Sequence, residues 1–155
     1  MQKHTGKEGY MAIKLDISKA YDRVEWAYLQ SVMEKMGFTE HWINLMMLCV
    51  KIVTYSILVN SKPKGMITPS RGIGQGDPLS PFLFFLCTEG LNGLINKAAH
   101  QLYIKGYSLY RNSPRLTHLL FADNSLLFHR ATIEECQRVL DILDMYGRCL
   151  GQQIN

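Results

Sequence analysis

The sequence lacks the long apolar run that a membrane-spanning helix needs. Its longest nearly apolar stretch, PLSPFLFFLC, is too short and too interrupted to cross a bilayer. The polar beginning of the chain, MQKHTGKEGY, has no apolar core of a signal peptide. We therefore expect a soluble, intracellular protein with no membrane partner.

Cysteine is also sparse. The chain has four cysteines, Cys49, Cys87, Cys136 and Cys149, and no two of them have C-x-x-C spacing. Scattered cysteines in helix-like segments favour core thiols over a zinc site or a disulfide-linked partner. Internal repeats, low-complexity tracts and long linkers are missing too, which excludes a repeat architecture.

What remains is typical of one compact unit. The 155 residues are about one domain's worth, and 47% hydrophobic with 19% charged residues is typical of a globular core rather than of disorder. The formal net charge of +4 allows a polyanionic partner but does not require one.

The first third of the chain predicts one strand and two helices. YMAIKLD, residues 10–16, alternates as a strand does and ends on a carboxylate. Asp22 and Glu25 resemble a capping box for the helix WAYLQSVMEKMG, which Gly37 would end. Thr39 would begin a second helix through HWINLMMLCV.

The rest of the chain predicts two hairpins and two helices. VTYSILVN and GMITP, separated by SKPK, are typical of a hairpin, and Ser80 with Pro81 begins a long helix. A second hairpin, LLFADNSLLF, follows, and then a T-x-x-E capping box at Thr132 and Glu135. This order indicates an α+β fold, an antiparallel sheet with helices packed on one face. Expected core positions are Trp26, Phe82, Val139, Leu140, Leu143 and Tyr146, and the last helix would end near Gly147 or Gly151.

LLFADNSLLF places a carboxylate and an amide, Asp123 and Asn124, between two apolar runs. One interpretation is turn chemistry alone, because both residue types tolerate the positive φ of a tight turn. The other interpretation involves Asp16, which ends the first predicted strand. If the strand and the hairpin share a sheet, their carboxylates meet at one edge, where they could hold hard cations such as Mg²⁺ for nucleotidyl transfer.

The loop GIGQGDP is the third candidate feature. Its glycines let the backbone approach a ligand closely, and Gln75 offers a donor and an acceptor to a base or sugar. Glycine-rich loops are often only connectors, so this loop gains weight only beside the carboxylates.

Four stretches together resemble the reverse transcriptases of non-LTR (long interspersed element) retrotransposons, in order and in spacing. The resemblance covers nearly the whole chain from about Tyr10 to Asn155. It implies a polymerase palm that copies RNA into DNA by extending a DNA primer on an RNA template. The palm would use deoxynucleoside triphosphates with Mg²⁺ or Mn²⁺, and the family implies that the protein acts in the nucleus. The stretches are KLDISKAYDRVEW, RGIGQGDPLSPFLF, HLLFADNSLLF and GQQIN.

The resemblance also implies roles for individual residues. The catalytic positions are Asp16, Asp123 and Asn124, and the two aspartates would hold the metals. Ile17, Tyr21, Gln75 and Gly76 match nucleotide-binding positions, with Tyr21 under the sugar. A nucleic-acid contact through Lys62, Lys64 and Arg71 is a further reading, beside that of a solvated charged loop. Asp22 and Arg23 match the family pattern too, although Asp22 could equally cap a helix.

The sequence departs from the family pattern at three places. Asn124 stands where relatives have a second aspartate, and Gly74 stands where they usually carry arginine. The third is extent: we expect residues 1–9 to be a remnant of the junction between fingers and palm, and residues 10–155 to be a partial palm with incomplete fingers and no thumb. The alternatives are therefore a catalytically inactive retroelement remnant or a nucleic-acid-binding module without turnover, and we expect little polymerase activity from the isolated chain.

Overall fold

A computed structural model of the chain describes residues 9–17, 19–110, 113–121 and 124–151. The chain divides into two compact units, the first made of residues 1–18 and 88–155 and the second of residues 19–87. Helix α3, Ser80–His100, contributes residues to both units. No described helix has the length and apolar character that a membrane crossing requires.

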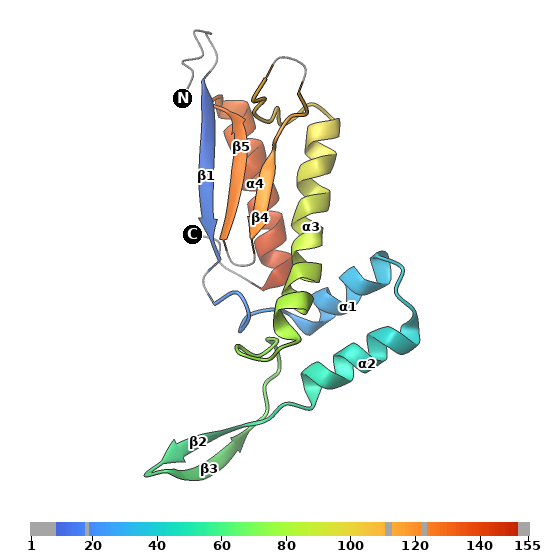
Figure 1. The fold of residues 1–155 in the computed structure, drawn as a ribbon, viewed down its shortest axis with the longest axis vertical. Coiled ribbons are helices and arrows are strands. Elements are labelled where there is room, and N and C mark those ends of the chain that lie inside the picture. Colours follow the sequence, from blue (N-terminus) through green and yellow to red (C-terminus); the bar gives the residue numbers. More distant parts are fainter. Residues whose placement is uncertain (1–8, 18, 111–112, 122–123, 152–155) are drawn as a thin grey trace. The chain divides into compact units, whose positions relative to one another are not determined.

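The first unit is built on a three-stranded antiparallel sheet in the order β1-β5-β4 (Figure 1). β1 is Tyr10–Asp16, β4 is His118–Phe121 and β5 is Asn124–Arg130. The predicted bounds of the first strand are confirmed at both ends. Helix α4, Ile133–Leu150, packs against the central strand β5, so the predicted α+β class with an antiparallel sheet is confirmed.

Burial alternates along β5, as expected of a strand with one covered face. Ser125, Leu127 and His129 are buried, whereas the residues between them are partly exposed. From α4, Val139, Leu143 and Tyr146 are buried as predicted, but Leu140 is 57% exposed, so that core prediction is wrong. Thr132 accepts a hydrogen bond from the Glu135 amide, which confirms the predicted N-cap, and Gly151 ends the helix.

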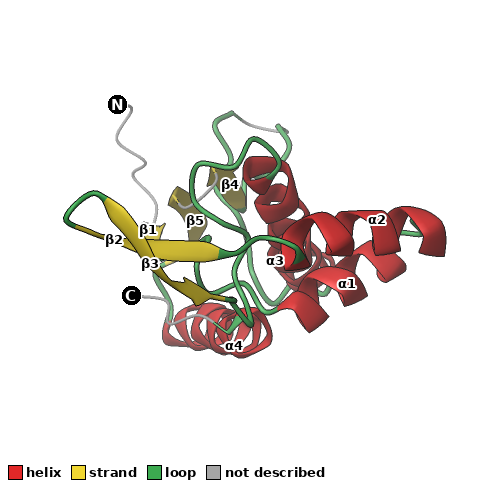
Figure 2. Cartoon of the chain, turned by 90° about the horizontal axis from the view of Figure 1, so that it is seen from below, coloured by secondary structure: helices red, strands yellow, loops and turns green. Residues whose placement is uncertain are grey.

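The second unit contains α1, Trp26–Lys35, and α2, Glu40–Lys51, which lie side by side (Figure 2). Thr39 caps α2 by accepting a hydrogen bond from the Trp42 amide, as predicted. The capping box predicted at the start of α1 is wrong, because Glu25 is itself the N-cap and its side chain makes no capping hydrogen bond. The core of this unit includes Val24, Leu29, Met33, Ile43, Met47, Leu83 and Phe84.

The β2–β3 hairpin of the second unit has no buried residue. β2 is Tyr55–Val59 and β3 is Lys62–Ile67, and every position in both strands is exposed. The turn is Asn60–Ser61, whose φ values of 51° and 62° suit a two-residue hairpin turn. The predicted connector SKPK is therefore wrong, since Lys62, Pro63 and Lys64 belong to β3.

Two further core predictions fail. The first is Phe82, which is 71% exposed. Trp26, also expected in the core, is half-buried, and its ring N–H donates a hydrogen bond to the Gly72 carbonyl. Of the four cysteines, only Cys87 is buried, while Cys49 and Cys149 are exposed. Burial raises the pKa of the Cys87 thiol to about 12.

Candidate active site

Asp16 and Asn124 lie directly opposite each other at one end of the three-stranded sheet. Asp16 is the last residue of β1 and Asn124 the first of β5, and the register pairs them. Opposite residues of antiparallel strands project to the same face, with Cβ atoms about 4.5 to 5.5 Å apart. Both residues are exposed, while their neighbours Leu15 and Ser125 are buried on the other face. A carboxylate and an amide are thus held together on the open face of the sheet.

Asn124 also pairs with Phe121, the last residue of β4. Asn124 is therefore a strand residue with a partner strand on each side, and its interpretation as a turn residue is wrong. Ala122 and Asp123 fall between these strands and lie outside the described residues. The role of Asp123 as a metal ligand stays a prediction.

A side-chain network fastens β4 to helix α3. His118 Nε2 lies 2.9 Å from Asn92 Oδ1, and the Asn92 amide donates to Glu89 Oε2 at 2.8 Å. Burial lowers the pKa of His118, and the negative charge of Glu89 opposes this shift. A neutral ring with its Nε2 proton on Asn92 fits this arrangement, so the network anchors the strand that leads to Phe121. Sequence reasoning missed this network, because nothing in the local pattern links positions 26 residues apart.

In the second unit, the GIGQGDP loop is fastened to the segment that follows β1. The Gly72 amide donates to the Val24 carbonyl at 2.8 Å, and the Ile73 amide donates to the Tyr21 carbonyl at 2.9 Å. Gly72 has a φ of +87°, and a Cβ there would lie 2.8 Å from the Asp22 carbonyl oxygen. Only glycine fits such a close approach of two backbones. The structure thus joins two of the four stretches that carried the resemblance.

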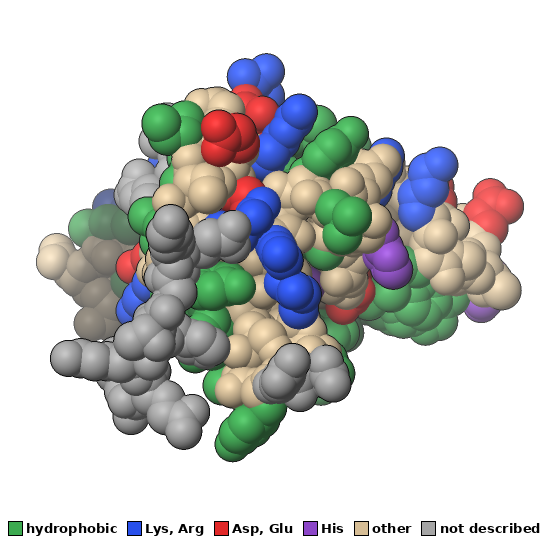
Figure 3. Space-filling view, turned by 90° about the horizontal axis from the view of Figure 1, so that it is seen from above, with side chains coloured by type: hydrophobic (Ala, Val, Ile, Leu, Met, Phe, Trp, Pro, Cys, Tyr) green, Lys and Arg blue, Asp and Glu red, His purple; other side chains and the backbone are tan. Residues whose placement is uncertain are grey.

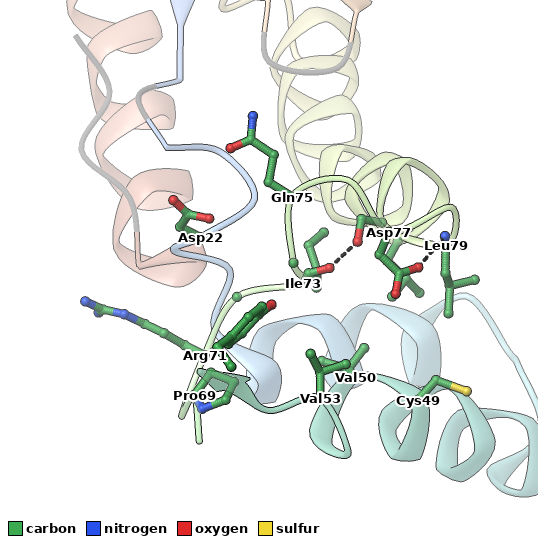
Figure 4. Close-up of a pocket in the computed structure, with 15 residues that line it drawn as sticks. Asp22, Cys49, Val50, Val53, Pro69, Arg71, Ile73, Gln75, Asp77 and Leu79 are labelled. Carbon is green, nitrogen blue, oxygen red and sulfur yellow. Dashed lines mark hydrogen bonds between the residues drawn. The ribbon is translucent and has the colours of Figure 1, made fainter. Parts of the chain in front are cut away.

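A pocket of about 400 Å³ opens beside this loop (Figure 4). Val50, Val53 and Leu83 supply apolar lining, and Asp22 and Gln75 supply polar lining. The Gln75 side chain extends away from Ile73 and Asp77, and the Arg71 side chain extends away from the pocket. Asp77 accepts a hydrogen bond from the Leu79 amide at 2.7 Å, just before α3, a helix-start role that sequence reasoning did not assign. The Asp-Pro pair before Ser80 was the available signal.

The remaining predicted nucleotide contacts differ in exposure. The Tyr21 ring packs against buried Phe84 with centroids 5.1 Å apart, and Gly76 is exposed. Ile17 is 3% exposed, so its side chain belongs to the core. Ile17, Asp16 and Asn124 belong to the first unit, and Tyr21, Gln75 and Gly76 belong to the second. Position 74 is also tight, because a Cβ there would lie 3.0 Å from Tyr55 Oη.

The predicted nucleic-acid contacts lie around the β2–β3 hairpin. Lys62 is paired with Val59, and Lys64 with Ile57, so both lysines share a face with exposed apolar residues. Arg71 instead lies 3.5 Å from Glu25 in an exposed ion pair. Such a pair contributes little to stability, because water screens it.

A family model described as reverse transcriptase (RNA-dependent DNA polymerase) matches residues 1–155, the whole chain. The chain belongs to the reverse transcriptase family. It is 28% identical over 146 residues to the retrovirus-related Pol polyprotein from type-1 retrotransposable element R2 of Popillia japonica, covering 94% of this chain and 23% of that protein. This likeness supports the predicted non-LTR type of reverse transcriptase.

The chain is similar to two further proteins. An uncharacterized mitochondrial protein of Arabidopsis thaliana is 54% identical over 68 residues, which are 44% of this chain and 56% of that protein. A solved structure of apo telomerase from Candida tropicalis, truncated from the C-terminal domain, matches with a TM-score of 0.70 and 13% identity over 94% of this chain and 29% of that one. This match shows the polymerase palm fold. The chain spans little more than half of the first of these curated relatives and about a quarter of the R2 polyprotein.

The oxygen atoms of the cross-strand pair Asp16 and Asn124, called the Asp16–Asn124 rung below, suit a divalent metal of the kind that reverse transcriptases generally use. Within the described residues, no three His, Cys, Asp or Glu side chains converge as a metal cage. Mg²⁺ needs no such cage, since it commonly binds one or two carboxylates together with substrate phosphates and water. One carboxylate and one amide oxygen on the open face fit this type of coordination.

Proposed function

We propose that this chain forms the palm of an RNA-directed DNA polymerase and that two-metal nucleotidyl transfer takes place at the Asp16–Asn124 end of the sheet. The pairing of Asp16 with Asn124 carries the proposal. It supports a metal-binding edge because the residues next to the two oxygen donors, Leu15 and Ser125, are buried on the other face of the sheet. That residues 10–155 are one part of a larger polymerase stays a prediction.

In this proposal Asp16, together with Asp123, holds Mg²⁺, with Mn²⁺ as a possible substitute. When bound, two such ions would stabilise the attacking and leaving oxygens. The Asp16 carboxylate lies on the open face of the sheet, and the side-chain amide of Asn124 lies on the same face opposite it. Tyr21 and Gln75 would contact the sugar and base of a deoxynucleoside triphosphate. The substrates would be an RNA template and a DNA primer.

Asn124 lowers the expected rate. At about 4 Å and an effective dielectric near 20, a carboxylate attracts a divalent ion by roughly 8 kcal/mol, an upper bound that water reduces. A quarter of that loss, about 2 kcal/mol, lowers a rate more than tenfold, at about 1.4 kcal/mol per factor of ten. The amide oxygen remains a neutral ligand, so activity is reduced rather than excluded.

A second candidate function is nucleic-acid binding without turnover. It rests on the exposed β2–β3 hairpin, where Lys62 and Lys64 stand beside Val59 and Ile57. Such a surface could hold a strand whether or not Asn124 supports catalysis.

Primer extension after grafting tests the first candidate. Residues 10–155 are placed between the fingers and thumb of an active relative, with Asn124 and with Asn124→Asp, and extension is measured with Mg²⁺ and with Mn²⁺. The proposal predicts extension by the Asn124→Asp graft, slower extension by the Asn124 graft, and none after Asp16→Asn. Extension that survives Asp16→Asn would exclude this edge as the catalytic site. Extension by neither graft would favour an inactive remnant.

A further inference from the structure

A second pocket lies in the first unit, between the C-terminal end of α3 and the start of β4. Its volume is about 330 Å³. Three basic side chains line it, together with an amide and an apolar wall. These residues are His100, Lys105, Arg115, Asn96, Leu102 and Ile104.

The pocket lining contains no Asp or Glu. Among the described residues, neither the Lys105 ammonium nor the Arg115 guanidinium takes part in an ion pair. Arg130 and Arg148, by contrast, pair with Glu135 and Asp144. Two cations beside a cavity with no carboxylate of its own create a positive potential that favours an anionic ligand.

The backbone around these cations is fixed by the fold. The Lys105 amide donates to buried Glu135 Oε2 at 3.1 Å, and the Arg130 amide donates to the same oxygen at 2.9 Å. Burial raises the pKa of Glu135, but the hydrogen bonds from these two amides and from the Arg130 side chain outweigh it, so the pKa lies below its usual value. The carboxylate thus stays ionised and holds the Lys105 backbone.

The Arg115 side of the pocket is held by a short bridge. Tyr107 and Leu116 exchange two main-chain hydrogen bonds of 2.8 Å each. A Cβ on Gly106 would lie only 2.4 Å from the Leu116 carbonyl oxygen, so glycine is required where these segments meet. Lys105 and Arg115 each adjoin a residue of this contact. The cationic groups are therefore carried by paired backbone rather than by a free loop.

The pocket is remote from the Asp16–Asn124 rung. Thr117, which lines it, precedes β4, whereas Asn124 pairs with Phe121 at the other end of that strand. Figure 1 shows the C-terminal end of α3 at the same end of the sheet as the start of β1, opposite the end of β1 that carries Asp16. Figure 3, drawn from above this end, shows Lys and Arg side chains gathered near the middle of the face. A ligand here would not occupy the proposed catalytic edge.

We propose that this pocket binds a phosphate group of a single-stranded RNA, as an accessory site outside the polymerase site. Lys105 and Arg115 contact the phosphate oxygens, the guanidinium through paired N–H donors. The Leu102 side chain, which is 82% exposed, accommodates the apolar face of a sugar or base. A phosphate ion alone would use the cations but not this apolar surface, which favours a nucleotide of a strand. The inference does not depend on catalysis by Asp16.

Fluorescence anisotropy with a labelled oligoribonucleotide of about 16 nucleotides tests the proposal. The 155-residue chain is titrated in EDTA over a series of salt concentrations, so that metal binding and turnover play no part. Lys105→Gln/Arg115→Gln is compared with Lys35→Gln/Arg148→Gln, which removes one lysine and one arginine charge at exposed positions outside the pocket. Circular dichroism melts check that both variants fold.

We expect the pocket variant to weaken RNA binding at least about fivefold and to lower the slope of log K against log salt by about 0.7, since the pocket holds one phosphate and each phosphate contact on a single strand contributes about 0.7. The control variant should change both far less. Equal effects of the two variants would overturn the proposal. Competition by inorganic phosphate or pyrophosphate at matched ionic strength, as strong as competition by unlabelled RNA, would overturn the assignment to a strand.

A second measurement uses the unmodified chain, so it does not depend on the folding of a variant. RNA carrying 4-thiouridine is photocrosslinked to the protein, and the crosslinked peptides are identified by mass spectrometry. Crosslinks within residues 96–117 would support the site. Crosslinks confined to residues 55–71 would place RNA on the β2–β3 hairpin instead and would contradict it. Neither result depends on the catalytic proposal, which the grafting experiment tests separately.

Discussion

The β4–β5 and β2–β3 hairpins differ in what surrounds them. β5 is the central strand of a sheet, paired with β1 and β4, and alternate residues along it are buried. Within the described part of the chain, β2 and β3 pair only with each other, and all their positions are exposed. Two-stranded hairpins without further packing are marginally stable.

This difference matches the functions proposed for the two hairpins. A metal ligand must be held within a fraction of an ångström, which requires a rigid support such as the paired strands β1 and β5, where Leu15 and Ser125 next to the rung are buried. A contact with nucleic-acid phosphates depends mainly on charge and tolerates movement. The β4–β5 hairpin is thus suited to chemistry, and the β2–β3 hairpin to a partner.

Leucine-to-alanine substitutions, one in each hairpin, should give the largest difference in the free energy of unfolding. Leu127 of β5 is 3% exposed and Leu58 of β2 is 69% exposed. We expect Leu127→Ala to reduce the free energy of unfolding by about 3 kcal/mol, because it leaves a cavity in the core. Leu58→Ala should change it by less than about 0.5 kcal/mol. Urea unfolding of both variants measures the difference, and equal losses would mean that β2–β3 is buried in the folded protein in solution.

The contribution of Glu135 to stability should depend on pH, because its carboxylate accepts a hydrogen bond from the amide of Arg130, the last residue of β5. Because the pKa of Glu135 is lowered in the folded state, its stabilising effect is present above the unfolded value near 4.5 and is lost as pH falls through the folded pKa. We expect Glu135→Gln to cost about 2 kcal/mol at neutral pH and progressively less as the pH falls below the unfolded value. Glu134→Gln, an exposed change in the same helical turn, is the control. A cost of Glu135→Gln that stayed constant with pH would contradict this account.

The smallest effect is expected at the tip of β2–β3. Lys62→Gln/Lys64→Gln should leave the unfolding midpoint unchanged but weaken RNA binding severalfold, with a salt slope lower by about 1.4 if both lysines contact phosphates. Anisotropy titrations against the unmodified chain measure this effect. An unchanged slope would mean that these lysines are solvated charges, the other reading of this loop.

Local signals predicted much of the fold. The alternation of YMAIKLD and the caps at Thr39 and Thr132 are short-range patterns, and the structure confirms them. Phe82 was misjudged because α3 begins with apolar residues on several faces, so that periodicity could not show which face is exposed. The turn at Asn60–Ser61 was missed because the Pro63 that follows suggested a loop, although an exposed edge strand tolerates proline.

Tertiary features of the site were less accessible from sequence. The alternation and the hairpin predicted that Asp16 would share a sheet edge with the second hairpin, and the pairing with Asn124 confirms this. The links from His118 to Asn92 and from Glu135 to the Lys105 amide join residues 26 and 30 positions apart, and no local pattern specifies such partners. One of these links holds the backbone of Lys105 beside the second pocket, and sequence alone did not suggest it.

Paramagnetic broadening by Mn²⁺ tests the central claim most directly. Amide resonances of the ¹⁵N-labelled chain are followed while Mn²⁺ is added with a deoxynucleoside triphosphate, and the series is repeated with Asp16→Asn. Our account predicts that broadening is strongest around Asp16 and Asn124 and disappears from both in the variant. Broadening centred elsewhere, or unchanged by Asp16→Asn, would contradict the assignment of this sheet edge as the metal-binding end of the palm.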